Sequence, residues 1–158
     1  MIDSTIETKK HISTVRDLIY IVVKELNSRT IKHDQSKLES LEKEIFDEYT
    51  PKLKNTTYGS EEYKQFLKEM KPALDNHYKK NRHHPEHYEN GIQDMTIVDI
   101  VEMIADWAAA TKRHADGCIG TSIVKNAERF GFGEDLVKIF LNTAREYKIG
   151  AQCEKIEG

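Results

Sequence analysis

The sequence has few cysteines, prolines and glycines, and it has no long apolar run. Its two cysteines, Cys118 and Cys153, are far apart with no second cysteine near either, so they signal neither a zinc ribbon nor a redox pair. We expect both to be reduced thiols. The longest apolar run, Leu18–Val23, is much shorter than the roughly 20 residues that span a bilayer. The sequence therefore predicts neither a disulfide scaffold nor a transmembrane protein.

The charge is nearly balanced. Lys and Arg number 24 and Asp and Glu number 27, which gives a formal net charge of −3. This balance gives no strong signal for nucleic acid or for an anionic membrane surface as a partner. The first ten residues lack the apolar segment and cleavage site of a secretory signal, so we expect a cytoplasmic location.

The scarcity of breakers leaves long stretches that can be helical. Three prolines and eight glycines are spread over 158 residues, and apolar residues recur at helical spacing in most of the chain. The sequence therefore predicts the all-α class, with about six helices in one compact domain over residues 1–150 and a flexible tail over 151–158. The expected helices cover residues 12–26, 36–49, 60–79, 96–114, 121–130 and 133–147, with loops at 51–59 and 81–91. Either Thr96 or Asp94 can cap the helix that ends at about residue 114.

The histidines stand mostly beside carboxylates or at the ends of expected helices. His11 falls on the apolar stripe of the first helix, which predicts an interior position. The His33-Asp34 pair precedes a helix that Ser36 would cap. His77 lies near the end of another helix, and further histidines follow in the loop at 81–91.

Imidazole and carboxylate side chains together suit divalent transition metals, namely Mn, Fe, Co, Ni or Zn. A site without cysteine usually keeps coordination positions open for water or substrate. The placement of the histidines therefore predicts a catalytic metal site rather than a structural one.

Five residues form a pattern that resembles a known superfamily. His11, then His33-Asp34 followed by Lys37, then Asp106, is similar to the H…HD…D signature of the HD-domain metal-dependent phosphohydrolases. The resemblance implies an all-α HD-type bundle, with extra histidines between the dyad and the last aspartate for a second metal. These histidines are only seven residues apart here, so we expect one metal rather than two. The implied ligands are His11, His33, Asp34, His77, His84 and Asp106.

The resemblance also implies a reaction. We expect hydrolysis of a nucleotide or related small phosphoester by a water that the metal activates. Glu102, Glu86 and Lys37 are the candidate catalytic residues. Cationic and polar side chains near the expected site are the candidate substrate ligands: Lys37, Asn81, Arg82, His83 and Arg113.

A second resemblance covers most of the chain. The segments at residues 81–87 and 102–107 are similar to a family of short uncharacterised phage and bacterial proteins, which implies the cytoplasm of a bacterium or of a phage-infected host. That resemblance names no reaction.

Other interpretations remain open. An HD-type di-iron oxygenase would use similar ligands, with two irons bridged by Asp34. A non-catalytic module that binds a nucleotide or a protein would need no turnover, and a homo-oligomer is also possible. In the simplest alternative, Asp34 only caps a helix, Asp106 is exposed, and the histidines of the loop are solvated. His114, near a helix end, is expected to stabilise the helix dipole rather than to bind metal.

Overall fold

The computed structural model describes residues 4–56, 60–113 and 117–152. Over these residues the chain forms seven α-helices and three short 3₁₀ helices, and it contains no strand. The predicted all-α class is therefore confirmed, with slightly more helices than expected. The sequence predicts one domain over residues 1–150, whereas the contacts divide the chain into two units that meet at the bond between His33 and Asp34.

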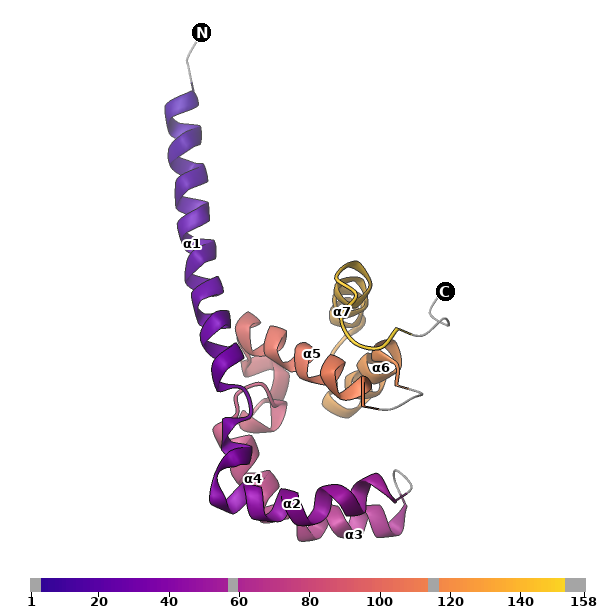
Figure 1. Cartoon of the computed structure of the whole chain (residues 1–158). Coiled ribbons are helices and arrows are strands. Elements are labelled where there is room, and N and C mark those ends of the chain that lie inside the picture. Colours follow the sequence, from indigo (N-terminus) through magenta and orange to yellow (C-terminus); the bar gives the residue numbers. More distant parts are fainter. Residues whose placement is uncertain (1–3, 57–59, 114–116, 153–158) are drawn as a thin grey trace. The chain divides into compact units, whose positions relative to one another are not determined.

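The first unit is a single long helix, α1 (Thr5–Lys32), which starts earlier and ends later than expected (Figure 1). None of its described residues is buried. His11 is exposed within this unit, so α1 by itself does not give it the predicted interior position. The apolar stripe is present, but it covers no core within this unit. A stripe of this kind gives the periodicity of a helix without saying what the helix packs against.

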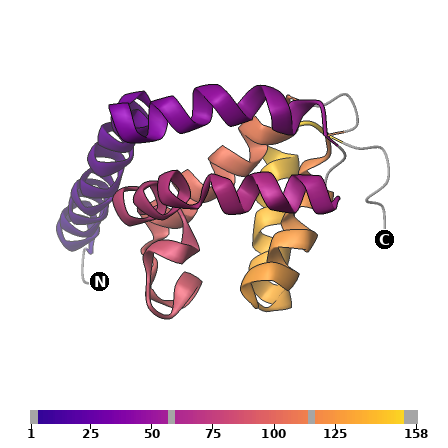
Figure 2. The same cartoon turned by 90° about the horizontal axis from the view of Figure 1, so that it is seen from below.

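In the second unit, helix α2 (Ser40–Lys54) packs alongside α3 (Glu61–Glu69) and α4 (Lys71–Lys80), and these two follow each other end to end (Figure 2). The sequence predicts one helix over residues 60–79, but the helix is broken at Met70 because Pro72 lies in the first turn of α4. The loop predicted at 51–59 starts later than expected, since Pro51 lies inside α2. The side chain of Ser60 accepts a hydrogen bond from the Tyr63 amide and caps α3.

The chain then passes through an irregular segment, as predicted, with two short 3₁₀ helices at Pro85–His87 and Gly91–Asp94. Helix α5 (Ile97–Thr111) follows. It starts with a capping box in which Thr96 and Asp99 exchange side-chain and backbone hydrogen bonds. The predicted start at Thr96 is therefore confirmed. His114, at the predicted end of this helix, lies outside the described residues.

The apolar core lies where α5 packs with α6 (Ile119–Phe130) and α7 (Glu134–Glu146) (Figure 2). The ring of Phe140 lies edge-on to Trp107, at 6.1 Å between ring centroids, and to Phe132, at 5.6 Å. Gly131 ends α6 with a φ of 68°, a left-handed conformation that suits glycine. The buried core residues are Met103, Ile104, Ala108, Ile119, Ile123, Phe140 and Ala144.

The end of the described chain returns to this core. The amide of Ala151 donates to Thr111 Oγ1 at 2.9 Å, and the Ile119 amide donates to the Ala151 carbonyl at 2.9 Å. The chain is thus held at residue 151, where the flexible tail is expected to begin. Cys118 is disulfide-bonded, so the prediction of a reduced thiol is wrong for this residue, and Cys153 lies outside the described residues. Among the described helices, none is long and apolar enough to cross a membrane.

Candidate metal centre

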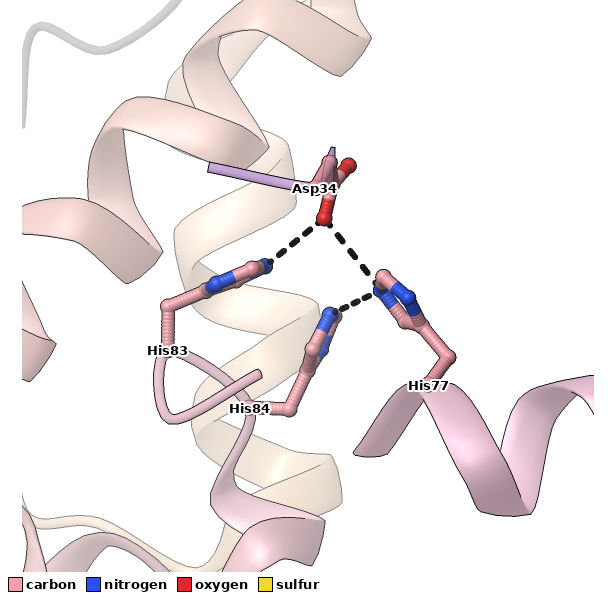
Figure 3. Close-up of side chains that lie close together, drawn as sticks. All are labelled: Asp34, His77, His83 and His84. Carbon is pink, nitrogen blue, oxygen red and sulfur yellow. Dashed lines mark hydrogen bonds and ion pairs between the residues drawn. The ribbon is translucent and has the colours of Figure 1, made fainter. Parts of the chain in front are cut away.

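Four side chains of the second unit converge on one point: Asp34, His77, His83 and His84 (Figure 3). Asp34 Oδ1 lies 3.3 Å from His77 Nε2 and 3.5 Å from His83 Nε2. The Nε2 atoms of His77 and His84 are 2.9 Å apart. The described residues therefore include a group of one carboxylate and three imidazoles that could hold a metal ion.

Asp34 is held in an unusual backbone conformation. It precedes the short 3₁₀ helix Gln35–Leu38 and has φ 56° and ψ 15°, the left-handed region in which aspartate is enriched among residues other than glycine. Lys37 Nζ bonds to its Oδ2 at 2.6 Å, while Oδ1 faces the histidines. A strained ligand residue of this kind is typical of functional sites, where the surrounding structure fixes the conformation.

His77 is oriented by a buried glutamate. Its Nδ1 lies 2.9 Å from Oε2 of Glu42, a residue with no exposed surface. The amide nitrogen of Asn81 also approaches Nδ1, but both of its hydrogens have other acceptors, Ser36 Oγ at 2.7 Å and the His77 carbonyl at 2.8 Å. We therefore assign the His77 Nδ1–H as a donor to Glu42, which leaves the lone pair on Nε2 directed at Asp34.

Glu42 is itself fixed in place. Ser36 Oγ donates to its Oε2 at 2.9 Å, and the side-chain amide of Asn76 donates to its Oε1 at 2.6 Å. Ser36 is buried within the Gln35–Leu38 turn and does not cap α2, so the predicted capping role is wrong. A carboxylate behind a ligand histidine sets the tautomer and the direction of the ring.

His83 has a matching arrangement. Its side chain is almost completely buried, and its Nδ1 lies 3.2 Å from Oε1 of Glu102 on α5. On the other side of the ring, Nε2 lies 3.5 Å from Asp34 Oδ1. The imidazoles of His77 and His83 thus approach the same oxygen of Asp34 from different elements, His77 from α4 and His83 from the loop that follows it (Figure 3).

The neutral form is favoured for two imidazoles of the cluster, those of His77 and His84. Burial, followed by the neighbouring His83 and His77, lowers the pKa of His84 to about 3. Burial is also the largest cause of the lowered pKa of His77, followed by the charge of Lys37. Metals bind the neutral imidazole, so this environment keeps the rings in the state that can act as ligands.

The donor atoms pass a simple test of fit. His77 Nε2 and His83 Nε2 lie 3.3 Å and 3.5 Å from the same carboxylate oxygen, Asp34 Oδ1, and each ring nitrogen without a proton directs a lone pair at that oxygen. Lone pairs that face each other repel, and a cation placed among them turns each contact into an attraction. The chemistry of the donor set therefore suits a divalent metal.

A comparison with known families covers almost the whole chain. Residues 2–150 match a family described as a family of unknown function, DUF5662. The chain belongs to DUF5662. No curated protein and no solved structure matches it. Because the description of DUF5662 names no activity, the resemblance to HD-domain phosphohydrolases stays a prediction.

Of the ligands expected for this DUF5662 chain, three lie in the cluster: Asp34, His77 and His84. Asp106 is half-buried on α5, and its carboxylate lies within 4.8 Å of that of Asp34. His33 is half-buried at the end of α1, directly before Asp34. His11 is exposed on α1, and none of the candidate metal groups among the described residues includes it. The geometry thus gives no support to His11 as a ligand.

Most of the expected substrate ligands are engaged by other protein groups. His83 belongs to the cluster, Asn81 is buried against Ser36 and His77, and Lys37 bonds to Asp34. Arg82 forms two hydrogen bonds to Asp99. Of the five expected substrate ligands, Arg113 alone, past the end of α5, is exposed with no side-chain hydrogen bond among those described.

The expected catalytic glutamates differ in position. Glu102 lies behind His83, where it can orient a ligand, which is one of the roles that its spacing suggests. Glu86 is exposed and pairs with Arg129 at 2.7 Å. Sequence reasoning missed Glu42 and assigned His83 to the substrate. The only available signal for His83 was its position between Arg82 and His84 in a histidine-rich loop.

Proposed function

We propose that this protein is a metal-dependent hydrolase of the HD type that acts on a nucleotide or a related small phosphoester. The observation that carries the proposal is the convergence of Asp34, His77, His83 and His84, with two of the imidazoles oriented by carboxylates. A set of oriented neutral imidazoles around one carboxylate is the kind of site that binds catalytic divalent metals.

The number of ligands favours a six-coordinate ion. Four protein ligands fill a tetrahedral zinc site completely, whereas they leave two positions of an octahedral ion open for water and substrate. Among Mn, Fe, Co, Ni and Zn, the first four therefore suit catalysis best. When bound, such a metal lowers the pKa of a coordinated water and neutralises charge on a phosphoryl oxygen.

The protein residues have separate tasks in this proposal. Asp34 and the three histidines hold the ion. Glu42 keeps the ring of His77, and Glu102 keeps the ring of His83, in the tautomer that can bind a metal through Nε2. Lys37 places a positive charge beside Asp34, which favours an anionic substrate at the open side of the ion.

The same lysine favours one metal over two. A di-iron oxygenase needs Asp34 to bridge both irons through its two oxygens. Oδ2 is bonded to Lys37 at 2.6 Å, and a cation in that position repels a second metal. We therefore propose a mononuclear centre and rank the oxygenase below the hydrolase.

Metal content and phosphate release test the proposal together. Protein purified without chelator is analysed for metals and then screened for phosphate release from nucleotides with Mn²⁺, Co²⁺, Ni²⁺ and Mg²⁺. We expect about one transition metal per chain. We also expect release that stops after chelation and returns when metal is restored.

Three other outcomes have different meanings. Two irons per chain with oxygen consumption and no phosphate release would favour the oxygenase. Bound metal with tight nucleotide binding and no turnover would favour a binding module. Hydrolysis that continues after complete removal of the metal would exclude the proposed chemistry.

A further inference from the structure

Arg82 joins the histidine loop to the start of α5. Its Nε lies 3.1 Å from Asp99 Oδ1 and its Nη2 lies 3.1 Å from Asp99 Oδ2, so the guanidinium and the carboxylate meet through two hydrogen bonds. Asp99 has no exposed surface, whereas 44% of the Arg82 side chain is exposed. The guanidinium also lies over the ring of Tyr88, at 5.4 Å from its centroid. This geometry fixes the direction of Arg82 much more firmly than a single contact would.

Asp99 does not depend on Arg82 alone. It is the third residue of α5 and accepts hydrogen bonds at Oδ2 from the Thr96 amide, at 2.9 Å, and from Thr96 Oγ1, at 2.7 Å. Its position in the first turn also places the carboxylate at the positive end of the helix dipole. Asp99 therefore keeps most of its support when the arginine is replaced.

Arg82, bound to Asp99, lies directly before His83, a member of the histidine cluster. The imidazole of His83 is held by Glu102, one helical turn beyond Asp99 on α5. The loop is thus attached to one face of α5 at two successive points. The first attachment fixes the backbone before His83, and the second fixes the ring of His83.

We propose that Arg82 is a positioning residue of the metal centre, which holds the loop on α5 so that His83 and His84 reach Asp34. The inference rests on the proposed metal centre but not on the proposed reaction. It differs from the expectation that Arg82 binds substrate, because the edge of the guanidinium formed by Nε and Nη2 is bound to Asp99.

Metal binding by the full-length protein, with Co²⁺ as the probe, tests the role. Metal-free protein is titrated with Co²⁺, and the visible absorption bands of the ion report both its affinity and its coordination. We expect Arg82→Gln to weaken Co²⁺ binding by about 10–100-fold, the usual effect of losing a residue that supports a ligand. The Co²⁺ bands should change as well, while far-UV circular dichroism of the metal-free protein stays as in the wild type.

Two further variants sharpen the test. Arg129→Gln removes the other arginine bound to this loop, through Glu86, and is the matched control. It should leave Co²⁺ affinity within about twofold of the wild type, since its pair lies beyond the ligand histidines. Asp99→Asn combined with Arg82→Gln should weaken binding no more than Arg82→Gln alone, because both changes break the same pair.

The outcomes separate positioning from mere stabilisation. Wild-type Co²⁺ affinity and spectrum in a folded Arg82→Gln protein would overturn the proposal, as would an equal loss in Arg129→Gln. If Arg82→Gln fails to fold, Arg82→Lys decides instead. Lysine keeps the charge but not the two-pronged geometry, so reduced affinity in a folded protein supports the role and wild-type affinity overturns it.

The same experiment distinguishes the positioning role of Arg82 from the proposed hydrolase reaction. Weak Co²⁺ binding by Arg82→Gln, in a protein whose wild type binds Co²⁺ but hydrolyses nothing, would keep the positioning role and remove the proposed reaction. A wild-type protein that binds no Co²⁺ would remove both.

Discussion

Two buried regions of the second unit are held together by opposite means. Around Phe140, apolar side chains from α5, α6 and α7 exclude water. Around Asp34, the buried groups are almost all polar; hydrogen bonds fix Glu42 and His77, and Glu102 lies 3.2 Å from His83. Helix α5 belongs to both, since its apolar residues face the core and Glu102 faces the histidine loop.

Each of the two regions depends on a different property of its side chains. Apolar packing tolerates changes of chemistry as long as volume is kept, whereas a polar cluster depends on the direction of each donor and acceptor. A change in the core should therefore be felt as lost stability, and a change around Asp34 as lost metal affinity. The following predictions test that separation, from the largest effect to the smallest.

Phe140→Ala should have the largest effect on stability. Phe140 is almost fully buried against Trp107 and Phe132, so truncation should lower the free energy of unfolding by about 3–5 kcal/mol. Urea denaturation measures this loss. Metal affinity of the remaining folded protein should stay near the wild-type value, and a parallel loss of affinity would show that the two regions are not separate.

Asp34→Ala should have the largest effect on the metal. Asp34 is the carboxylate on which the imidazoles converge, so affinity should fall by more than about 100-fold, beyond the usual effect of changing a supporting residue. Isothermal titration calorimetry with Co²⁺ measures the change. Asp47→Ala, which alters an exposed aspartate of α2, is the control. Unchanged affinity in the Asp34 variant would exclude this centre.

Glu42→Gln should weaken the metal site without touching a ligand. The amide keeps the shape of the side chain but loses the charge that orients His77, so affinity should fall by about 10–100-fold. Glu44→Gln changes an exposed residue of the same helix and should have no effect. Equal affinities in the two variants would mean that Glu42 has a purely structural role.

Acidification should destabilise the metal-free protein through His84. The folded state lowers the pKa of His84 to about 3, mainly through burial, from an ordinary value of 6.5. The neutral form is favoured on folding, so its contribution is complete above pH 6.5 and is lost as the pH falls toward 3. The loss amounts to at most about 1.4 kcal/mol per pH unit.

Urea unfolding in chelator at pH 7 and pH 5 measures this dependence. His84→Gln should flatten it, because glutamine does not titrate. The same slope in wild type and variant would place the titrating group elsewhere.

The sequence predicted the core region well because its signals are local. The apolar spacing of α5 and the Thr96 cap are visible within one helix, and Gly131 announces the end of α6. The break at Met70 was missed, since the apolar spacing over residues 60–79 continues across it, although Pro72 lies in the first turn of α4. Propensity and periodicity decide where helices form, and they work best where neighbours in sequence are also neighbours in space.

The metal centre was predicted only in part because its contacts are long-range. Asp34, His77 and His84 were implied as ligands by the resemblance to a motif. Glu42 gave no signal, since its partner His77 is 35 positions away along the chain and nothing in α2 marks a buried glutamate. The interior position of His11 stays a prediction, because an apolar stripe shows which residues share a face but not whether that face is covered.

Three of the four converging side chains come from a short stretch of chain, residues 77–84, and only Asp34 is distant. A denatured chain therefore keeps these three imidazoles close together, since little loop closure is needed to gather them. If the proposed centre binds a divalent cation, we expect such a chain to retain part of that affinity. Added metal then raises the unfolding temperature by less than the native affinity alone would give, because the ion binds both states.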